Sequence, residues 1–194
     1  MFVVAQGMPR SGTAGISKIV NSPEAQAVNM RLSSAVITVL KDDDGVIPWG
    51  QLSGSDIAVV SLGSRADNSF SRMCKKYAPC ILYGSTDGHL SVAEMAKIRQ
   101  HKKVIVAVFK QTEAVASALH KLGELPGAMA VCFINPYKMA KMQRQLSSFG
   151  VIISGFDDTR LINEAAAQVI FGGLAASGKL PVALKGWMPQ GTGI

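Results

Sequence analysis

The sequence predicts an α/β fold, a three-layer α/β/α sandwich around a mostly parallel sheet of five or six strands. Short, β-branched apolar runs alternate with amphipathic segments about five times, which is typical of strands buried on both faces between helices. The links are short, so right-handed crossovers would place helices on both sides of the sheet. Hydrophobic residues make up 48% of the 194 residues and charged residues 17%, as in a globular chain with a core.

The first predicted helix begins at Ser22, whose hydroxyl can cap it, followed by Pro23 and the acidic Glu24. Helical periodicity predicts that it continues to about Lys41. Aspartates 42–44 and a glycine then form a turn, because their spacing lacks the pattern of a calcium loop. A second polar turn is expected at 51–55. The predicted buried face of the helix comprises Ala25, Val28, Leu32, Ala35, Val36 and Val39.

The remaining elements alternate regularly. Strands are predicted at 57–62, 80–83, 103–109, 128–134 and 151–153. Helices are predicted at 67–77, 91–100, 112–122, 137–148 and 161–170. Ser91 and Glu94 have the spacing of a capping box. The last helix has Asp157 and Asp158 as candidate N-caps and stops at a glycine pair that begins with Gly172.

Residues after the last helix match most of a phosphate-binding loop. Gly173, Gly178 and Lys179 fit the pattern, but Leu180 stands where a hydroxyl is required. Such a loop follows a strand and opens a helix, whereas here a helix comes first and Pro181 favours extended backbone afterwards. The order therefore disfavours a nucleotide-dependent enzyme, and Lys179 is interpreted as a surface lysine.

Composition excludes several classes of function. The net charge is +7, but the basic residues are scattered and few aromatic residues accompany them, so no nucleic-acid partner is predicted. No apolar run approaches the ~18 residues of a membrane span. No dinucleotide fingerprint is present, so no cofactor is predicted. The chain has three cysteines, Cys74, Cys80 and Cys132. Because their number is odd and no two form a C-x-x-C pair, neither a disulfide nor a metal site is predicted. The histidines are predicted at the surface or at helix ends: His89, His101 and His120.

Ligands of open parallel sheets bind at the carboxyl ends of the strands. The polar side chains expected there are candidates for residues near a substrate: Ser64, Arg65, Asp87, Asn135, Tyr137, Asp157 and Asp158. None is predicted to be catalytic. The sequence has no G-x-S-x-G motif and no late histidine after an acid, so a hydrolase triad is not indicated. Paired carboxylates could serve glycoside hydrolysis, but helix capping already explains Asp157 and Asp158.

Two motifs at opposite ends of the domain carry a family resemblance. Residues 30–42, 45–48 and 57–60 resemble the start of the C-terminal α/β sandwich domain of glycoside hydrolase family 3, where a helix ending in LLKN is followed by a turn, LLPL and a strand. Residues 165–173 and 178–182 are similar to the family's ending, a small-residue helix, FG, a loop and SG(K/R)LPV. The resemblance covers residues 22–185.

The resemblance implies a larger bacterial parent, periplasmic or secreted, that hydrolyses O-glycosyl bonds of a carbohydrate substrate. An N-terminal (β/α)8 barrel would carry the aspartate nucleophile and would be this domain's partner. Residues 1–21 would then be a linker or lead-in, 22–185 the domain, and 186–194 a tail that could lead into a further domain. The domain would support the barrel and be inactive when isolated.

The chain also departs from the family. The turn after 151–153 lacks the common PG or GQEGG sequence, which puts a direct contact with the sugar in doubt. No glutamate aligns with the acid/base that β-glucosidase-like members take from this domain, which favours the β-N-acetylglucosaminidase-like branch, whose barrel supplies a His-Asp pair. The alternative is a stand-alone α/β module that binds a small ligand at its strand-end loops. The glutamates considered for the acid/base are Glu24, Glu94, Glu113, Glu124 and Glu164.

Overall fold

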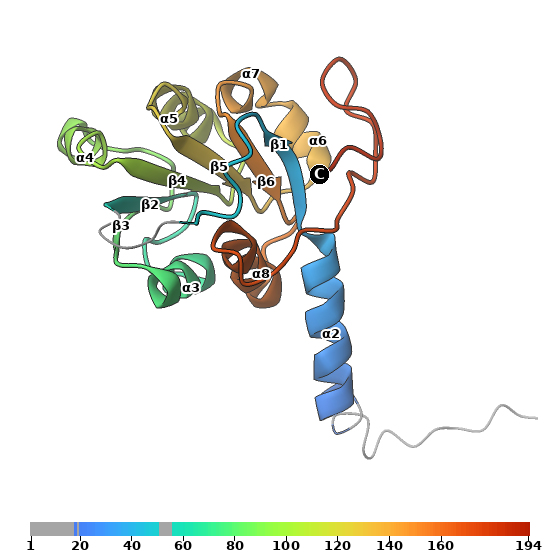
Figure 1. Ribbon diagram of the computed structural model, residues 1–194. Coiled ribbons are helices and arrows are strands. Elements are labelled where there is room, and N and C mark those ends of the chain that lie inside the picture. Colours follow the sequence, from blue (N-terminus) through green and yellow to red (C-terminus); the bar gives the residue numbers. More distant parts are fainter. Residues whose placement is uncertain (1–17, 19, 51–55) are drawn as a thin grey trace, which may run out of the picture.

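The computed structural model describes residues 18, 20–50 and 56–194, and in this part of the chain a six-stranded sheet lies between two layers of helices (Figure 1). The predicted α/β sandwich is confirmed. The predicted lead-in 1–21 lies mostly outside the described residues, and the predicted turn 51–55 lies wholly outside them. The strands are β1 (Thr38–Asp42), β2 (Ile57–Leu62), β3 (Cys80–Ser85), β4 (Lys103–Val108), β5 (Ala128–Cys132) and β6 (Val151–Ser154). The helices are α2 (Pro23–Val36), α3 (Ser69–Tyr77), α4 (Val92–Ile98), α5 (Glu113–Gly123), α6 (Pro136–Ala140), α7 (Gln143–Leu146) and α8 (Arg160–Ile170).

The strand order is β1-β6-β5-β4-β2-β3. All neighbouring pairs are parallel except β1 and β6, which are antiparallel. Side chains of α4, α5, α6 and α7 pack on one face of the sheet, and those of α3 and α8 pack on the other. Both faces are covered, which is why β2, β4 and β5 are continuous apolar runs rather than alternating ones.

The prediction that the first helix continues to Lys41 is wrong, because α2 ends at Val36 and β1 follows. Ile37 is extended, with φ −64° and ψ 120°, and is fully buried. Thr38 then pairs with Ser154, the last residue of β6. The apolar positions after Val36 fit a helical period, but the open edge of β6 offers a strand partner, and this tertiary pairing overrides the local pattern.

The predicted buried face of this helix is also wrong. No residue of α2 is buried, and Val28 and Leu32 are 52% and 60% exposed. Figure 1 shows the reason: most of α2 stands away from the sheet and from both helix layers. Of the six predicted inward residues, Val36 packs against the core under α3 and α8, and Val39 is buried because it belongs to β1.

The predicted helix 137–148 is two short helices, α6 and α7. They are separated at Met142, whose backbone has φ −111° and ψ 21° and whose N–H donates to the carbonyl of Met139 at 2.9 Å. This bond closes a turn tighter than an α-helical one. Neither glycine nor proline stands at the break, so no residue pattern predicts it.

The cap of α8 differs from the prediction. Thr159 is the N-cap, with extended backbone and a hydroxyl that accepts from the Ile162 N–H at 3.4 Å. Asp157 accepts instead from the N–H of Asp158 at 2.9 Å, and Asp158 accepts from the side chain of Asn163 at 2.8 Å. The two aspartates are therefore free of the capping role that explained them in the sequence.

Replacing Thr159 with alanine is expected to lower the free energy of unfolding by about 1 kcal/mol, because α8 loses the acceptor for an N-terminal N–H group. Urea denaturation would measure the loss. Asp157→Ala is the matched control and should change stability by less than about 0.5 kcal/mol, since it is an exposed residue that caps no helix. Equal losses in the two variants would contradict this assignment of the cap.

The stretch after α8 closes the outer edge of β1. Gly172 has φ +77°, and the N–H of Gly173 donates to the carbonyl of Gln168 at 2.8 Å, which ends the helix. The N–H of Gly178 then donates to the carbonyl of Ile37 at 3.0 Å, and the N–H of Ile194 to that of Val39 at 3.1 Å. Strand β1 is thereby covered on its free side, as edge strands commonly are.

Lys179, predicted to be a surface lysine, is exposed, and its ammonium donates to the carbonyl of Gly193 at 2.6 Å. The N–H of Leu180 donates to the carbonyl of Thr192 at 2.7 Å. Residues 186–194 therefore fold back on the domain. The boundary at 185 and 186 remains a prediction.

Candidate functional site

The carboxyl edge of the parallel strands is the candidate site, and the loops that leave it hold the predicted residues. Because the strand order runs β6-β5-β4-β2-β3, these residues fall into two groups along the edge. The first, the β6–β5 group, comprises Asn135, Tyr137, Asp157 and Asp158. The second, the β2–β3 group, comprises Ser64, Arg65 and Asp87.

In the β6–β5 group, Asn135 and Tyr137 are positioned by the start of α6. The side chain of Asn135 accepts from the Lys138 N–H at 2.9 Å and caps the helix, which fixes its orientation. Tyr137 is 65% exposed. β5 and β6 are neighbours in the sheet, about 5 Å apart. The exposed phenol ring and the two carboxylates therefore follow neighbouring strands at the same edge.

Asn163, which the sequence analysis missed, adds a buried amide behind this group. Its side-chain nitrogen donates to Asp158 at 2.8 Å, while its oxygen has no hydrogen-bond partner among the described residues. Asn163 is only 4% exposed, and an unpaired buried polar atom costs about 1–3 kcal/mol. The signal in the sequence is a lone polar residue inside the apolar stripe of the last helix.

The backbone between β6 and these aspartates is strained. Phe156 has φ 62°, in the left-handed region that residues with a Cβ seldom occupy. The N–H of Phe156 donates to the Ser154 hydroxyl at 3.2 Å, and its ring packs on the core under α4 to α7. Strain of this kind costs about 1–3 kcal/mol and is often found at functional loops.

In the β2–β3 group, Asp87 is held by its neighbours. The hydroxyl of Ser85 donates to the Asp87 carboxylate at 2.5 Å, and the N–H of His89 donates to it at 3.0 Å. These bonds favour the charged carboxylate, so they hold the pKa of Asp87 below its usual value, with the Ser85 hydroxyl as the larger cause. Lys110, at the end of β4, donates to the Thr86 carbonyl at 3.0 Å and ties the two loops together.

Ser85→Ala is expected to raise the pKa of Asp87, because the larger of its two hydrogen bonds is lost. The native carboxyl has a lower pKa than the unfolded one, so its contribution to stability is full above the unfolded pKa and is lost as pH falls through the folded pKa. NMR titration of the Asp87 carboxyl would show the shift. A titration curve unchanged by the substitution would contradict the assigned cause.

The two groups lie far apart on the same edge. Asp87 follows β3 and Asp157 follows β6, and four strand spacings of about 4.8 Å put these strand ends roughly 19 Å apart. A pair of carboxylates that hydrolyses a glycoside lies about 5–9.5 Å apart. Within the described residues, no hydrogen bond or ion pair links the two groups. The edge therefore does not bring Asp87 and Asp157 together as a catalytic pair.

A second polar cluster lies at the opposite, amino edge and was not anticipated. His101 contacts Asp56 through Nδ1 at 2.5 Å and the Tyr83 hydroxyl through Nε2 at 3.0 Å. The His101 side chain is only 12% exposed, and its N–H donates to the carbonyl of Ile98, the last residue of α4, at 3.1 Å, so of the two predicted positions the helix end is the one it occupies. Burial, and then the charge of Asp56, raise the pKa of Tyr83. The cluster ties edge strand β3 to the segments before β2 and β4.

The largest of the cavities described here, about 530 Å³, also opens at the amino edge. Trp49, Lys103 and Glu124 are among its lining residues, and the Lys103 ammonium lies 4.6 Å from the centre of the Trp49 ring. A second cavity of about 350 Å³ lies between β1 and the loop after α8, lined mainly by apolar side chains. Neither cavity is lined by a predicted site residue.

The described residues hold no cluster of three or more histidine, cysteine or acidic side chains that could bind a metal ion. No helix in this part of the chain is long and apolar enough to span a bilayer. All three cysteines are buried free thiols. Burial raises the pKa of Cys80 to about 11 and that of Cys132 to about 12, and raises that of Cys74 as well. Thiols in this state are poor nucleophiles.

Neither a protein-family model nor a curated protein matches the sequence. Solved structures do match the fold. The chain superposes on a fungal multi-domain family 3 β-N-acetylglucosaminidase with a TM-score of 0.72 and 18% identity, covering 92% of this chain and 21% of that one. A glycoside hydrolase family 3 β-N-acetylglucosaminidase from Paenibacillus sp. str. FPU-7 matches with a TM-score of 0.63 and 17% identity, over 94% and 36% of the two chains.

A β-glucosidase from Listeria innocua matches with a TM-score of 0.61 and 12% identity, covering 84% of this chain and 27% of that one. The chain thus spans about a fifth to a third of the length of these proteins. Its fold is that of one part of each larger chain. At these identities the likeness concerns the fold, and it agrees with the fold that the two sequence motifs imply.

Proposed function

We propose that this chain is the C-terminal α/β domain of a family 3 glycoside hydrolase whose catalytic barrel lies elsewhere in a parent polypeptide. The observation that carries the proposal is the match of nearly the whole chain to a fraction of each enzyme, 21% and 36% in the two β-N-acetylglucosaminidases. The motif at 178–182, which led to the family from sequence, has a structural role in this fold, because Gly178 seats the chain on β1.

The arrangement of the site favours a role in which this domain buttresses the barrel, rather than catalysis within the domain itself. Asp87 and Asp157 are too widely spaced along the edge for a carboxylate pair, and the cysteines are buried. His101 does have an acidic partner and a hydroxyl, but the hydroxyl belongs to Tyr83 in strand β3, which the cluster anchors. The parent would hydrolyse O-glycosyl bonds of a carbohydrate, with the nucleophile supplied by the barrel.

Within the family, the β-N-acetylglucosaminidase-like branch is the better supported. Two of the matched structures are enzymes of that kind, and the fungal one has the higher TM-score, 0.72 against 0.61 for the Listeria β-glucosidase. A β-glucosidase-like parent is the alternative within the family. A periplasmic or secreted parent remains part of the proposal, and fractionation of cells that express the parent would test it.

The β6–β5 group is where this domain would approach the sugar. Tyr137 offers an exposed ring and hydroxyl at the edge that also carries Asp157 and Asp158, and such groups can contact sugar rings and hydroxyls. In the active parent, Tyr137→Ala is expected to raise KM for a nitrophenyl β-N-acetylglucosaminide about tenfold, with a smaller change in kcat. Val92→Ala is the control, since Val92 is 88% exposed at the start of α4, which follows β3 on the far side of the sheet from β5 and β6. Equal KM values for Tyr137→Ala and the unchanged parent would show that Tyr137 does not contact the substrate.

The second candidate is a stand-alone module that binds a small ligand at the same edge. The unpaired oxygen of Asn163 and the strain at Phe156 are the observations in its favour. A thermal-shift screen of the 194-residue chain with monosaccharides and amino sugars would separate the two functions. Saturable stabilisation that Tyr137→Ala abolishes would favour the binding module, because a ligand of the native state raises the unfolding temperature.

A further inference from the structure

Helix α2 has a well-specified start but few residues of the domain to pack on: it contacts α8, and Val36 at its end reaches the core under α3 and α8. Ser22 accepts from the Ala25 N–H at 3.2 Å, and Pro23 occupies the first turn, so the start of the helix is well specified. Yet none of its 14 residues is buried. A helix of this length is marginal in water without tertiary contacts. Its stable formation in the working protein therefore requires more packing surface than its contact with α8 provides.

Four of the unburied apolar residues form a stripe on one face of α2. Ala25, Val28, Leu32 and Ala35 follow one another at intervals of three or four residues, the spacing of a packing face. Val36 continues the stripe into the core under α3 and α8. Met30 is equally exposed, at 59% against 60% for Leu32, but lies two residues away and therefore on a different face.

We propose that this stripe, which we call the α2 stripe (Ala25, Val28, Leu32 and Ala35), is the surface on which the preceding domain of the parent polypeptide packs. The inference rests on the proposed function and names the contact that joins the two domains. The occupant is an apolar patch on the tethered domain. The matched enzymes support this, because this fold makes up only 21% and 36% of their chains and the remainder belongs to other parts.

The size of the stripe favours a tethered domain over a second copy of the chain. Fourteen residues rise about 21 Å, so one face about 10 Å wide offers roughly 200 Å². A stable interface between separate proteins buries about 800 Å² from each partner. A covalently joined domain is held at a high effective concentration and needs no such area. The α2 stripe is therefore adequate for a tethered partner and too small to hold a dimer by itself.

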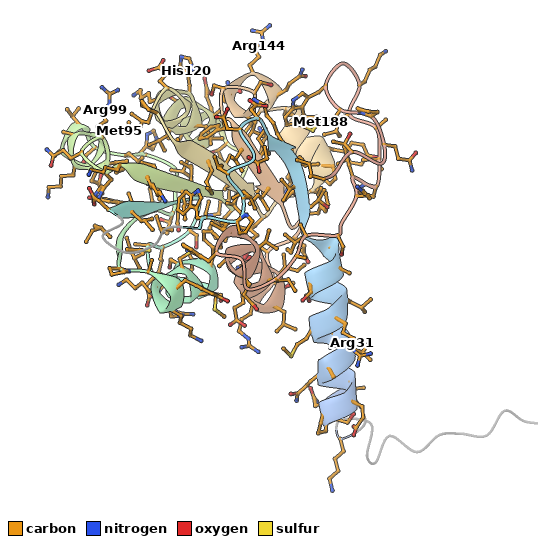
Figure 2. The ribbon with its side chains drawn as sticks, in the orientation of Figure 1. Arg31, Met95, Arg99, His120, Arg144 and Met188 are labelled. Carbon is orange, nitrogen blue, oxygen red and sulfur yellow. The ribbon has the colours of Figure 1, made fainter. Side chains whose placement is uncertain are left out.

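The short connection between α2 and β1 determines at which edge of the sheet a domain docked on α2 would lie. Only Ile37, fully buried, separates the helix from β1, and Thr38 pairs with Ser154 at the carboxyl end of β6. The helix therefore leaves the sheet at the same edge as Asp157 and Asp158. Figure 1 shows α2 leaving that corner, and Arg31 lies on its free part in Figure 2. A domain docked on α2 is placed beside the β6–β5 group.

The test compares the parent polypeptide with the 194-residue chain by amide hydrogen exchange. In the 194-residue chain, amides of α2 should exchange within about tenfold of unstructured rates, since none of its residues is buried. In the parent they should be slowed at least 100-fold. Leu32→Glu in the parent should abolish this protection, and Met30→Glu should leave it intact. Equal exchange in the two proteins, or equal effects of the two substitutions, would overturn the α2 stripe as the docking surface.

Two further outcomes separate the possible occupants. If sedimentation shows the 194-residue chain as a dimer that Leu32→Glu dissociates, the occupant is a second copy, and the inference is wrong. If the parent hydrolyses glycosides but its α2 amides are unprotected, the inference fails while the proposed function stands. If the parent has no glycosidase activity, the proposed function fails, and protection of α2 then reports only on a domain of another kind.

Discussion

Replacing Phe133 with alanine is expected to lower the free energy of unfolding by about 3–5 kcal/mol, the cost of deleting a buried aromatic side chain. Phe133 directly follows β5 and is buried against Phe70 of α3 and Phe109 after β4, with ring centres 5.2 and 4.9 Å away. The side chain therefore joins one helix to two strand ends beneath the candidate edge. Denaturant unfolding of the 194-residue chain would measure the loss.

Tyr137→Ala is the matched control for Phe133→Ala. Both remove an aromatic ring close to the end of β5, but Tyr137 is exposed and touches no core, so its loss should change stability by less than about 0.5 kcal/mol. A loss below about 1 kcal/mol for Phe133→Ala would show that this corner can repack, and would contradict the structure's account of the core.

Gly178→Ala is expected to cost about 2–3 kcal/mol, at the upper end of what an added methyl group costs in a packed site. A Cβ at this position would lie 2.4 Å from the Thr38 hydroxyl, 2.5 Å from the Val36 carbonyl oxygen and 2.7 Å from that of Ile37. Two of these atoms are backbone and cannot move without displacing the joint between α2 and β1. The closing segment would lift away from β1.

Gly150→Ala provides the control for this glycine. No atom lies within 4 Å of a Cβ built on Gly150, which stands in the loop before β6, so stability should change by less than about 0.5 kcal/mol. Thermal unfolding of both variants would compare them. Similar transitions for Gly178→Ala and Gly150→Ala would show that the close approach of the segment to β1 is not required.

The fold was largely predictable because its central strands are specified locally. Residues 57–62, predicted as a strand from a continuous apolar run, are β2 with the same bounds. The capping box of Ser91 and Glu94 is confirmed at the start of α4. Strand β1 was missed because its partner, β6, lies more than 100 residues away in sequence. A periodicity pattern carries no information about such a pairing.

The candidate site was predictable in position but not in arrangement. The strand-end rule predicted that Asn135 and Asp157 lie at the carboxyl edge, where the structure has them, since the rule depends only on where strands end. Their separation from Asp87 follows from the strand order, which no local pattern contains. Asn163 and His101 were missed for a related reason. Each acquires its importance from burial and from a partner, Asp158 or Asp56, that the folded chain supplies.

The α2 stripe shows a different case, in which the helical pattern and the burial of the described residues disagree. Val28 and Leu32 have the spacing of a buried face, and the described residues leave them exposed. Amphipathic periodicity indicates that one face of a helix packs against something, but it does not indicate which partner packs there. The mismatch between pattern and burial is what identifies a docking surface.

The most direct test of the central claim is the release of nitrophenol from a nitrophenyl β-N-acetylglucosaminide and a nitrophenyl β-glucoside by the parent polypeptide and by the 194-residue chain, at equal molar concentration. The account predicts turnover by the parent, faster on the β-N-acetylglucosaminide, and none above the uncatalysed rate by the 194-residue chain. Turnover by the 194-residue chain at the rate of the parent would contradict it, because catalysis would then reside in this domain.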